Sequence, residues 1–206
     1  MGRPPRNFED GIYHVAAHAS DTRYLFLSPD DRDDFLERLA ASLWPLGIRV
    51  LDYVLMSNHY HALVHTPDAR LSKGLQLLHT EYSRHHNQRY HRSAHLFRAH
   101  CVTRAVTSDE QLLTAYRYIA RNPVLARLVL DPLEWPWSSA RAHAGLERPS
   151  IQLDEEPIRD ALGQTPNWRH EYRELIRRED DIELDRRSAA GVGSRAVLSR
   201  VVPSTE

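Results

Sequence analysis

Four strand-like and two helix-like segments alternate in a fixed order over the first half of this chain, and that order restricts the fold more than any other feature. The strand-like segments are short and rich in Val, Leu, Tyr and Ala, whereas the helix-like segments carry apolar residues at intervals of three and four. Strands are predicted at residues 11–18, 49–56, 59–65 and 99–106, and helices at residues 29–44 and 71–82. The order is therefore strand, helix, strand, strand, helix, strand.

Local signals support these boundaries. Ser28 is placed to cap the first helix, with Pro29 at the first helical position and Asp31 completing a capping box. Ser57-Asn58 is a tight-turn signal that joins the second and third strands as a hairpin. The order of elements then predicts an α+β fold of the ferredoxin-like (β-α-β-β-α-β) type, an antiparallel sheet with helices on one face. The opposite face is expected to be free for a ligand.

A further helix is expected after the last strand. Thr107 and Glu110 have the spacing of a capping box, and Leu112, Tyr116 and Ile119 mark the buried face of this helix. Since the residue before a proline avoids helical geometry, the helix is predicted to end at the Asn-Pro pair of residues 122–123.

The remainder of the chain is predicted to be an appendage to a main domain at residues 1–146. Residues 147–187 are rich in acidic side chains, and we predict a helix within residues 157–178. Residues 188–206 are small, polar and rich in Gly, Ser and Arg, a composition typical of a disordered tail. The sequence thus predicts a partly helical acidic extension at 147–187 and a tail at 188–206.

Composition restricts the cellular context. Cys101 is the only cysteine, so no internal disulfide can form and a reducing compartment is expected. The longest apolar runs, such as residues 53–56, are far shorter than a membrane span, and residues 1–10 lack the apolar core of a signal peptide. We therefore expect a cytoplasmic protein that makes no contact with a membrane.

Charge is distributed unevenly along the chain. The net charge of −1 does not by itself indicate a partner, but residues 84–104 contain five arginines and no acidic residue. Such a stretch can hold phosphates even on a neutral protein, and the alternative is an arginine-rich face that contacts only water. The candidate phosphate-binding residues are Arg84, Arg89, Arg92, Arg98 and Arg104.

Two histidines are the first candidate site. His59 and His61 are separated by one residue in a predicted strand, so both imidazoles point to the same face of the sheet. Two imidazoles on one face can chelate a divalent cation. A chain with 13 histidines contains such a pair by chance about once, so the pair alone also fits a structural role.

A tyrosine and an asparagine form the second candidate site. Tyr118 and Asn122 are four residues apart in the predicted helix and share a face that differs from the buried face of Tyr116. A phenol and an amide would then project together from the helix. The alternative is a partly buried tyrosine beside an asparagine that caps the helix end.

Three ordered motifs resemble the signatures of the REP-associated tyrosine transposases, which belong with the small single-strand transposases of insertion sequences in the HUH nuclease superfamily. The motifs are Met56-Ser57-Asn58-His59-Tyr60-His61-Ala62-Leu63-Val64, Tyr118-Ile119-Ala120-Arg121-Asn122-Pro123-Val124-Leu125-Ala126 and Trp135-Pro136-Trp137-Ser138-Ser139. The Tyr13-His14-Val15 and His95-Leu96-Phe97-Arg98 segments also resemble this family. The resemblance covers roughly residues 11–146, so residues 1–146 are expected to form the catalytic domain.

This resemblance implies a ferredoxin-like fold and a defined chemistry. It assigns the metal-binding histidines to His59 and His61, the nucleophile to Tyr118 and a third, polar metal ligand to Asn122. The cofactor it implies is Mg²⁺ or Mn²⁺. The implied reaction is metal-dependent cleavage and joining of single-stranded DNA through a 5′-phosphotyrosine, acting on a hairpin of the REP palindrome type. A bacterial, nucleoid-associated protein would follow, as a monomer or a homodimer.

Two segments depart from the family pattern. His18 stands where the first strand of the family usually ends in an arginine. The segment Arg98-Ala99-His100-Cys101 stands where the family usually has glutamine and then Arg-Phe. These differences concern the DNA-contacting surface more than the chemistry.

Two alternatives from other classes of function stay open at this point. One is a protein that binds hairpin DNA without cutting it, which would form no covalent adduct. The other is an unrelated metal hydrolase, which would require further carboxylate or histidine ligands around His59 and His61 and would work without Tyr118.

Overall fold

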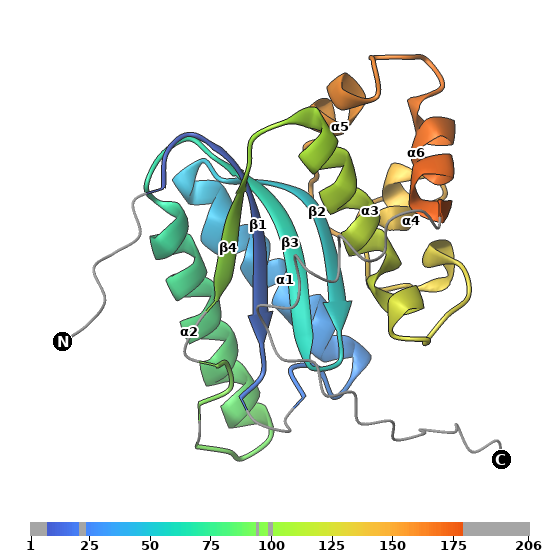
Figure 1. The fold of residues 1–206 in the computed structure, drawn as a ribbon. Helices are drawn as coiled ribbons and strands as arrows, with labels where there is room; N and C mark the ends of the chain where they lie inside the picture. Colours follow the sequence, from blue (N-terminus) through green and yellow to red (C-terminus); the bar gives the residue numbers. More distant parts are fainter. Residues whose placement is uncertain (1–7, 21–23, 94, 99–100, 179–206) are drawn as a thin grey trace, which may run out of the picture.

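The computed structural model describes residues 8–20, 24–93, 95–98 and 101–178. A four-stranded antiparallel sheet forms its centre (Figure 1). The strands are β1 (Gly11–His18), β2 (Arg49–Met56), β3 (His59–Thr66) and β4 (Val102–Val106). The longer helices are α1 (Pro29–Leu43), α2 (Leu71–Arg89), α3 (Asp109–Leu125) and α6 (Trp168–Arg177). The shorter helical elements are η1 (Trp44–Leu46), η2 (Pro132–Glu134), α4 (Ala140–His143) and α5 (Glu156–Ala161).

The strand order is β2-β3-β1-β4, and each neighbouring pair is antiparallel. This order places β3 and β1 in the middle of the sheet, and it confirms the α+β, ferredoxin-like prediction. The hairpin at Ser57-Asn58 is also confirmed, because β2 and β3 pair from Met56 and His59 outward. The predicted fourth strand begins later than expected, at Val102, while residues 99–100 of that prediction lie outside the described part of the chain.

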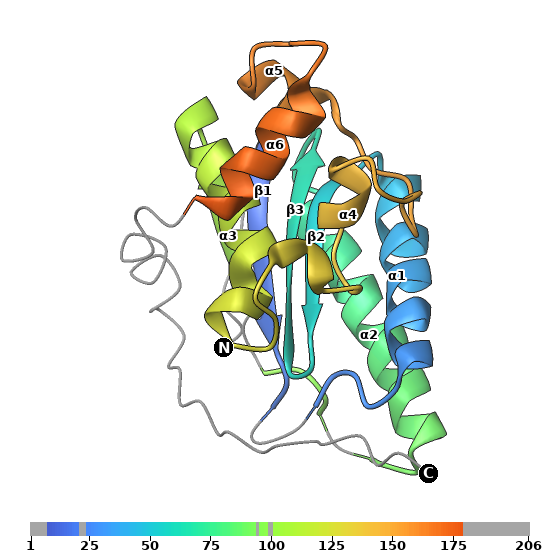
Figure 2. The same ribbon diagram turned by 90° about the vertical axis from the view of Figure 1, so that its right-hand side faces the viewer.

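One face of the sheet is covered by α1 and α2 (Figure 2). Side chains that alternate along β1 and β3 pack against both helices, as a pleated strand requires. The predicted capping box of α1 is present, with the Ser28 hydroxyl accepting from the Asp31 backbone N–H and the Asp31 carboxylate accepting from the Ser28 N–H. Tyr82 is buried in this core, where its hydroxyl donates to the Leu25 carbonyl at 2.6 Å.

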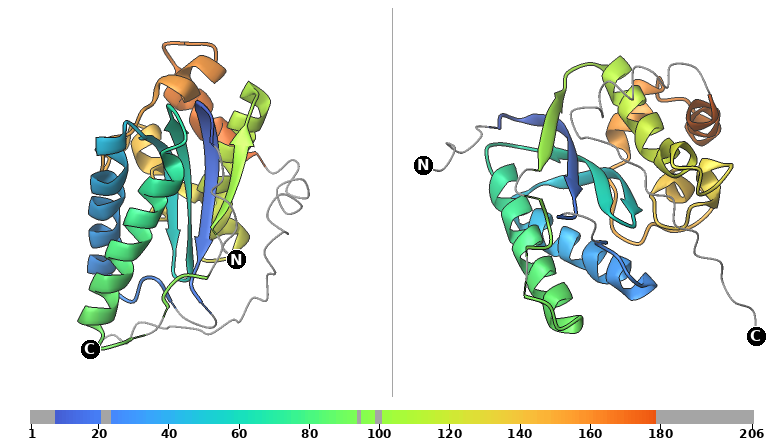
Figure 3. Two further views of the ribbon diagram at one scale, coloured as in Figure 1. Left: turned by 90° about the vertical axis from the view of Figure 1, so that its left-hand side faces the viewer. Right: turned by 60° about the horizontal axis from the view of Figure 1, so that its bottom comes forward.

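The other face is covered in part by α3 and the helices after it (Figure 3). These helices form a second apolar cluster over β2 and β3, in which Tyr116 and Ile119 of α3 are fully buried. The predicted buried face of this helix is therefore confirmed. The expectation of a wholly free second face is wrong, because α3 contacts both β2 and β3. The part of this face over β1 and β4 is less covered, and there Arg104 is exposed.

From Val50 onward β2 is buried on both faces, in keeping with a sequence that is apolar there except for Asp52. An irregularity between Val50 and Asp52 shifts its register against β3. The segment around the Trp-Pro-Trp-Ser-Ser motif pairs with the free edge of β2, where the Leu55 N–H donates to the Trp137 carbonyl at 2.8 Å and the Ser139 N–H donates to the Tyr53 carbonyl at 3.1 Å. The motif therefore closes the edge of the sheet.

Two boundaries predicted for α3 are wrong. The N-cap is Ser108, whose hydroxyl accepts from the Gln111 N–H, and the Thr107 N–H is satisfied by the Gln111 side chain. Thr107 and Glu110 have the spacing of a capping box, but the helix is capped one residue later, by the Ser108 side chain alone. The helix also continues through Pro123 to Leu125. A proline so close to the end removes one helical hydrogen bond, and the following turns still form, with the Ala126 N–H bonded to the Asn122 carbonyl at 3.0 Å.

The acidic extension contains two short helices, α5 and α6, where one helix was predicted; the chain turns between them at Gly163, in the left-handed region at φ +79°. Both helices pack on α3, and the guanidinium of the buried Arg121 donates to the carbonyls of Ile176 and Arg177 at the end of α6. Up to Arg178 the extension thus supports α3. The predicted tail at 188–206 lies outside the described residues, and the division of the chain at residue 146 stays a prediction.

Candidate active site

Histidines line the sheet face that looks toward α3. His59 and His61 alternate along β3 with Tyr60 and Ala62, which point into the core under α1 and α2. His14 and His18 lie four residues apart in β1 and face the same side, because strand side chains repeat every two residues. The register places His18 directly opposite His59. Four imidazoles therefore gather on one patch in the middle of the sheet.

α3 brings Tyr118 and Asn122 to this patch. The Tyr118 ring lies 5.2 Å from the His61 ring and 5.8 Å from the His14 ring, centroid to centroid, with the planes roughly perpendicular. One turn later, the Asn122 side-chain oxygen lies 3.1 Å from His59 Nε2. Tyr118 is half-buried while Asn122 is buried. The structure thus places all four residues of the two sequence motifs in one site.

The helix can present these side chains because its opposite face is anchored. Tyr116 and Ile119 pack in the second core, and the Tyr116 hydroxyl donates to the Leu51 carbonyl at 3.5 Å. Arg121 ties the helix to the end of α6. Residues 118 and 122 fall on the remaining face, toward β1 and β3. The rotation of α3 about its axis is therefore set by packing on β2 and on the extension.

Burial keeps the site histidines neutral at physiological pH. Desolvation, with a contribution from the Arg104 guanidinium, lowers the pKa of His14 to about 4. Desolvation and the neighbouring His18 lower the pKa of His59 to about 4. The pKa of His61 is also well below its usual value, first through burial and then through the other imidazoles. Neutral imidazoles retain a lone pair, which is the form that binds metal ions.

The surroundings of His59 fit a cation. Its Nδ1 lies 2.8 Å from the Asn58 side-chain oxygen, and its Nε2 lies 3.1 Å from the Asn122 side-chain oxygen. A neutral imidazole carries only one proton, whereas both nitrogens of His59 face an amide oxygen. One of these nitrogens therefore turns its lone pair toward the lone pairs of an oxygen, and the two repel each other. A cation held by His59 and Asn122 would remove that repulsion. His59, His61 and Asn122 would supply two nitrogens and one oxygen, a mixed set of donors.

The described residues contain no group of three or more His, Cys, Asp or Glu side chains arranged to hold a metal ion. Asn122 is an amide and does not belong to such a group, and the remaining coordination positions in a His-His-Asn site fall to water or to substrate oxygens. In the same part of the chain, no helix is long and apolar enough to cross a membrane.

The five candidate arginines separate into two groups. Arg104 is the cross-strand partner of His14, and Arg98 donates its backbone N–H to the His18 carbonyl at 2.9 Å, so both lie beside the histidine patch. Arg84 and Arg89 lie on α2, behind the sheet, and pair with Glu81 and with Asp30 of α1, respectively.

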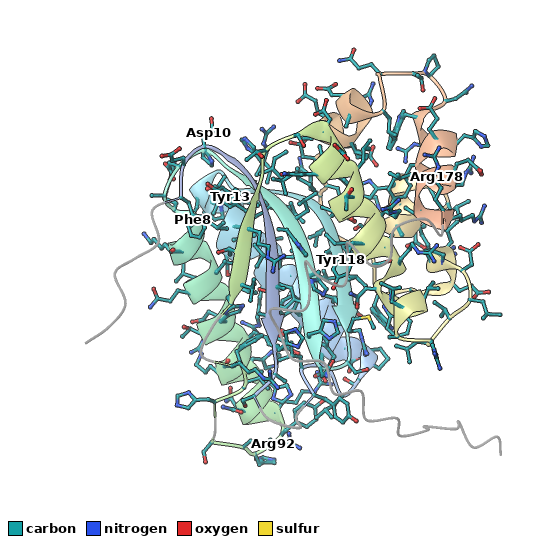
Figure 4. The ribbon with its side chains drawn as sticks, viewed as in Figure 1. Phe8, Asp10, Tyr13, Arg92, Tyr118 and Arg178 are labelled. Carbon is teal, nitrogen blue, oxygen red and sulfur yellow. The ribbon has the colours of Figure 1, made fainter. Side chains whose placement is uncertain are left out.

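Arg92 lies beyond the end of α2, far from Tyr118 (Figure 4). The exposed Arg98 and Arg104 are therefore the two candidates that face the site.

Sequence reasoning missed three residues that touch the paired histidines. His14 Nε2 lies 3.0 Å from His61 Nδ1, Asn58 contacts His59, and the His18 ring stacks on the His59 ring at 4.7 Å. A signal was present, because His14 and His18 are an even number of residues apart in a predicted strand. His18, a departure from the family pattern, stacks on His59 at the edge of the site.

We expect the substitution His59→Gln to flatten the pH dependence of stability between pH 6.5 and 4. The pKa of His59 is about 4 in the folded chain and 6.5 in the unfolded chain, so only the unfolded chain takes up this proton as the pH falls through that window. Stability present above pH 6.5 is therefore lost toward pH 4, by at most about 3 kcal/mol for this ring. Urea unfolding of the metal-free protein at several pH values measures this loss of stability. The substitution His170→Gln, at an exposed histidine, serves as the control. If stability depended on pH equally in His59→Gln and in the wild type, the lowered pKa of His59 would be contradicted.

Comparison with known proteins bears on the family and on the fold. Residues 7–122, more than half of the chain, match the family model described as transposase IS200 like. A solved structure of a REP-associated tyrosine transposase bound to a REP hairpin has a similar fold, with a TM-score of 0.61 at 14% identity, and the match covers 75% of this chain and 93% of that one. No match is found among curated proteins. The resemblance noted in the sequence motifs is thus supported independently, and the chain belongs to the family of IS200-like transposases.

Proposed function

We propose that this protein is a metal-dependent nuclease and strand transferase that cuts single-stranded DNA through a covalent 5′-phosphotyrosine at Tyr118. The observation that carries this proposal is the meeting of Tyr118 and Asn122 of α3 with His59 and His61 of β3. Two motifs more than 50 residues apart in sequence converge on one site. Membership of the IS200-like transposase family supports the same reaction class.

Tyr118 supplies the nucleophile. Its phenol oxygen attacks the phosphorus, the bond from phosphorus to the 3′ oxygen breaks, and the DNA remains attached to the enzyme through its 5′ phosphate. The phenolic proton passes to solvent and the departing 3′ oxygen takes up a proton to become a hydroxyl. Because the phosphotyrosine is itself a phosphodiester, attack by another 3′ hydroxyl reverses the chemistry and joins strands without ATP.

His59, His61 and Asn122 would hold the divalent cation, Mg²⁺ or Mn²⁺. A bound cation neutralises charge on the phosphate oxygens and orients the phosphate for in-line attack. The donor set includes two imidazole nitrogens, which suit Mn²⁺ better than Mg²⁺, since Mg²⁺ prefers oxygen ligands. The anchoring of α3 on β2 and α6 holds Tyr118 against the histidine patch, so that phosphate and nucleophile share one site.

We infer that the substrate is a DNA hairpin with an adjoining single strand, similar to a REP palindrome. The solved structure with the same fold holds a REP hairpin. In this chain, Arg98 and Arg104 are exposed beside the patch, where they can contact phosphates of the strand that enters the site. The half-covered sheet face over β1 and β4 leaves room for that strand.

The proposal is tested by incubating the full chain with a labelled single-stranded hairpin DNA and Mn²⁺, followed by a denaturing gel. A labelled band at the mass of protein plus DNA is expected, and it should disappear with protease or with EDTA added beforehand. Binding of the hairpin without any adduct, under conditions in which Mn²⁺ binds, would instead identify a hairpin-binding protein that no longer cuts. Cleavage that continues without Tyr118 would favour a metal hydrolase.

We expect Arg98→Ala and Arg104→Ala each to weaken hairpin binding and to lower its salt dependence. Each loses about one phosphate contact, so the slope of log K against log salt should fall by about 0.7 to 0.9. Fluorescence anisotropy at several salt concentrations measures this. Arg84→Ala is the matched control, because Arg84 pairs with Glu81 behind the sheet. Equal losses in Arg84→Ala and Arg104→Ala would show that the sheet face is not the DNA-binding surface.

A further inference from the structure

In both histidines of the proposed metal site, Nδ1 is engaged by a side chain that is not a proposed metal ligand. The Nδ1 of His59 lies 2.8 Å from the side-chain oxygen of Asn58, the residue before it in the hairpin turn. The Nδ1 of His61 lies 3.0 Å from Nε2 of His14, which comes from the neighbouring strand β1. The two contacts have unrelated origins, one local and one across the sheet, and yet both involve Nδ1. The other nitrogen of His59, Nε2, faces the proposed ligand Asn122.

A hydrogen bond between two neutral imidazoles uses one proton, so one ring donates and the other accepts. If His61 donates from Nδ1, its Nε2 carries a lone pair and can bind a cation. If His14 donates instead, the proton of His61 moves to Nε2 and blocks that position. In His59 both ring nitrogens face an amide oxygen, Nδ1 that of Asn58 and Nε2 that of Asn122, and an amide oxygen can only accept. Asn58 can therefore hold the proton on Nδ1 when Nε2 and the Asn122 oxygen are both turned toward a cation.

We propose that His14 and Asn58 are positioning residues that keep the proton of His61 and of His59 on Nδ1, so that both Nε2 atoms face a divalent cation. The inference rests on the proposed metal site and adds residues that touch neither the cation nor the DNA. In metal sites, the partner of the second ring nitrogen fixes the tautomer and the ring orientation.

The two partners differ in strength. His14 is half-buried, and its ring contacts both the His61 ring at 5.1 Å and the Tyr118 ring at 5.8 Å, so it is itself held in place. Asn58 is exposed in the turn, and water can replace its side chain as an acceptor. Loss of the His14 contact should therefore affect the site more than loss of the Asn58 contact.

The test uses the metal-free full chain with ¹⁵N-labelled histidine, and it compares the wild type with His14→Phe and His14→Gln. Phe keeps a ring of similar shape but has no acceptor, whereas Gln retains a side-chain oxygen that can accept from His61 Nδ1. The ¹⁵N chemical shifts report which nitrogen carries the proton. A titration with Mn²⁺, followed by electron paramagnetic resonance, reports affinity without any need for cleavage.

We expect the proton of His61 on Nδ1 in the wild type and in His14→Gln, and a mixture of tautomers in His14→Phe. The affinity for Mn²⁺ should fall by about 10- to 100-fold in His14→Phe and by only a few-fold in His14→Gln. Asn58→Leu should give a smaller loss than His14→Phe, with Asn58→Asp close to the wild type. If His14→Phe does not fold, the comparison of Asn58→Leu with Asn58→Asp still tests the inference.

The experiment distinguishes failure of the His14 role from failure of the proposed metal site. A wild-type chain that binds Mn²⁺ while His61 carries its proton on Nε2, or a His14→Phe variant with undiminished affinity, would overturn the role of His14 and leave the proposed function standing. A wild-type chain that has both Nδ1–H tautomers but binds no Mn²⁺ would instead overturn the metal site, and with it the presentation of Nε2 to a cation.

Discussion

Replacing Tyr118 with phenylalanine is expected to abolish the covalent adduct, with a loss of cleavage rate on the order of 10⁶, the size found when another covalent nucleophile is removed. The substitution deletes one oxygen and almost no volume. The ring contacts with His61 and His14 are retained, so the fold, Mn²⁺ binding and hairpin binding should stay unchanged. Single-turnover cleavage with labelled hairpin DNA measures the loss.

Two other tyrosines are matched controls. The Tyr82 hydroxyl donates to the Leu25 carbonyl in the core under α1 and α2, and the Tyr116 hydroxyl donates to the Leu51 carbonyl in the second core. Their phenylalanine variants should cleave at rates within a few-fold of the wild type. Tyr82→Phe should lose about 1 kcal/mol of stability with its hydrogen bond. An adduct that survives in Tyr118→Phe and is missing in Tyr82→Phe would overturn the assignment of the nucleophile.

Replacing His59 or His61 with alanine is expected to remove both Mn²⁺ binding and cleavage. The cation contributes several kcal/mol by neutralising phosphate charge, which corresponds to a loss of roughly 10³-fold or more in rate. Hairpin binding should persist, because phosphate contacts away from the cation supply most of the affinity. Isothermal titration with Mn²⁺ and a cleavage assay on the same preparations measure both effects.

His65 provides the control for this pair. It lies on the same strand and the same face, four residues beyond His61, but it contacts Asp10 and Arg49 at the other end of the sheet. His65→Ala should therefore retain Mn²⁺ binding and cleavage. Full cleavage by both His59→Ala and His61→Ala would reject the metal role of the pair, whatever the result for His65→Ala.

The fold was predictable because its signals are local. The spacing of the apolar residues, the capping box at Ser28 and the turn at Ser57-Asn58 each act within a few residues. Together they predict the order of strands and helices along the chain. The His-x-His pair was predicted to share a face for the same reason. The end of α3 was predicted wrongly at Pro123. A proline near the end of a helix removes only one hydrogen bond, and the packing of α3 in the second core offsets that loss.

The environment of the site was less predictable because it depends on contacts between distant segments. The approach of His14 to His61 follows from the register of β1 against β3 and from side-chain orientation, which the sequence pattern does not specify. Residues 84–104 include no acidic residue, yet Arg89 forms an ion pair with Asp30 of α1, which is 59 residues earlier in the sequence. Local charge composition therefore does not separate the arginines beside the histidine patch from those that pair behind the sheet.

The most direct test of this account is to identify the amino acid that carries the DNA. The wild-type protein is incubated with hairpin DNA and Mn²⁺, the adduct is digested with nuclease and trypsin, and the modified peptide is sequenced by tandem mass spectrometry. The account predicts a single modified peptide with the nucleotide 5′ phosphate on Tyr118, and a free 3′ hydroxyl on the released DNA. A phosphate on Tyr82 or Tyr116, or cleaved DNA without any linked peptide, would contradict it.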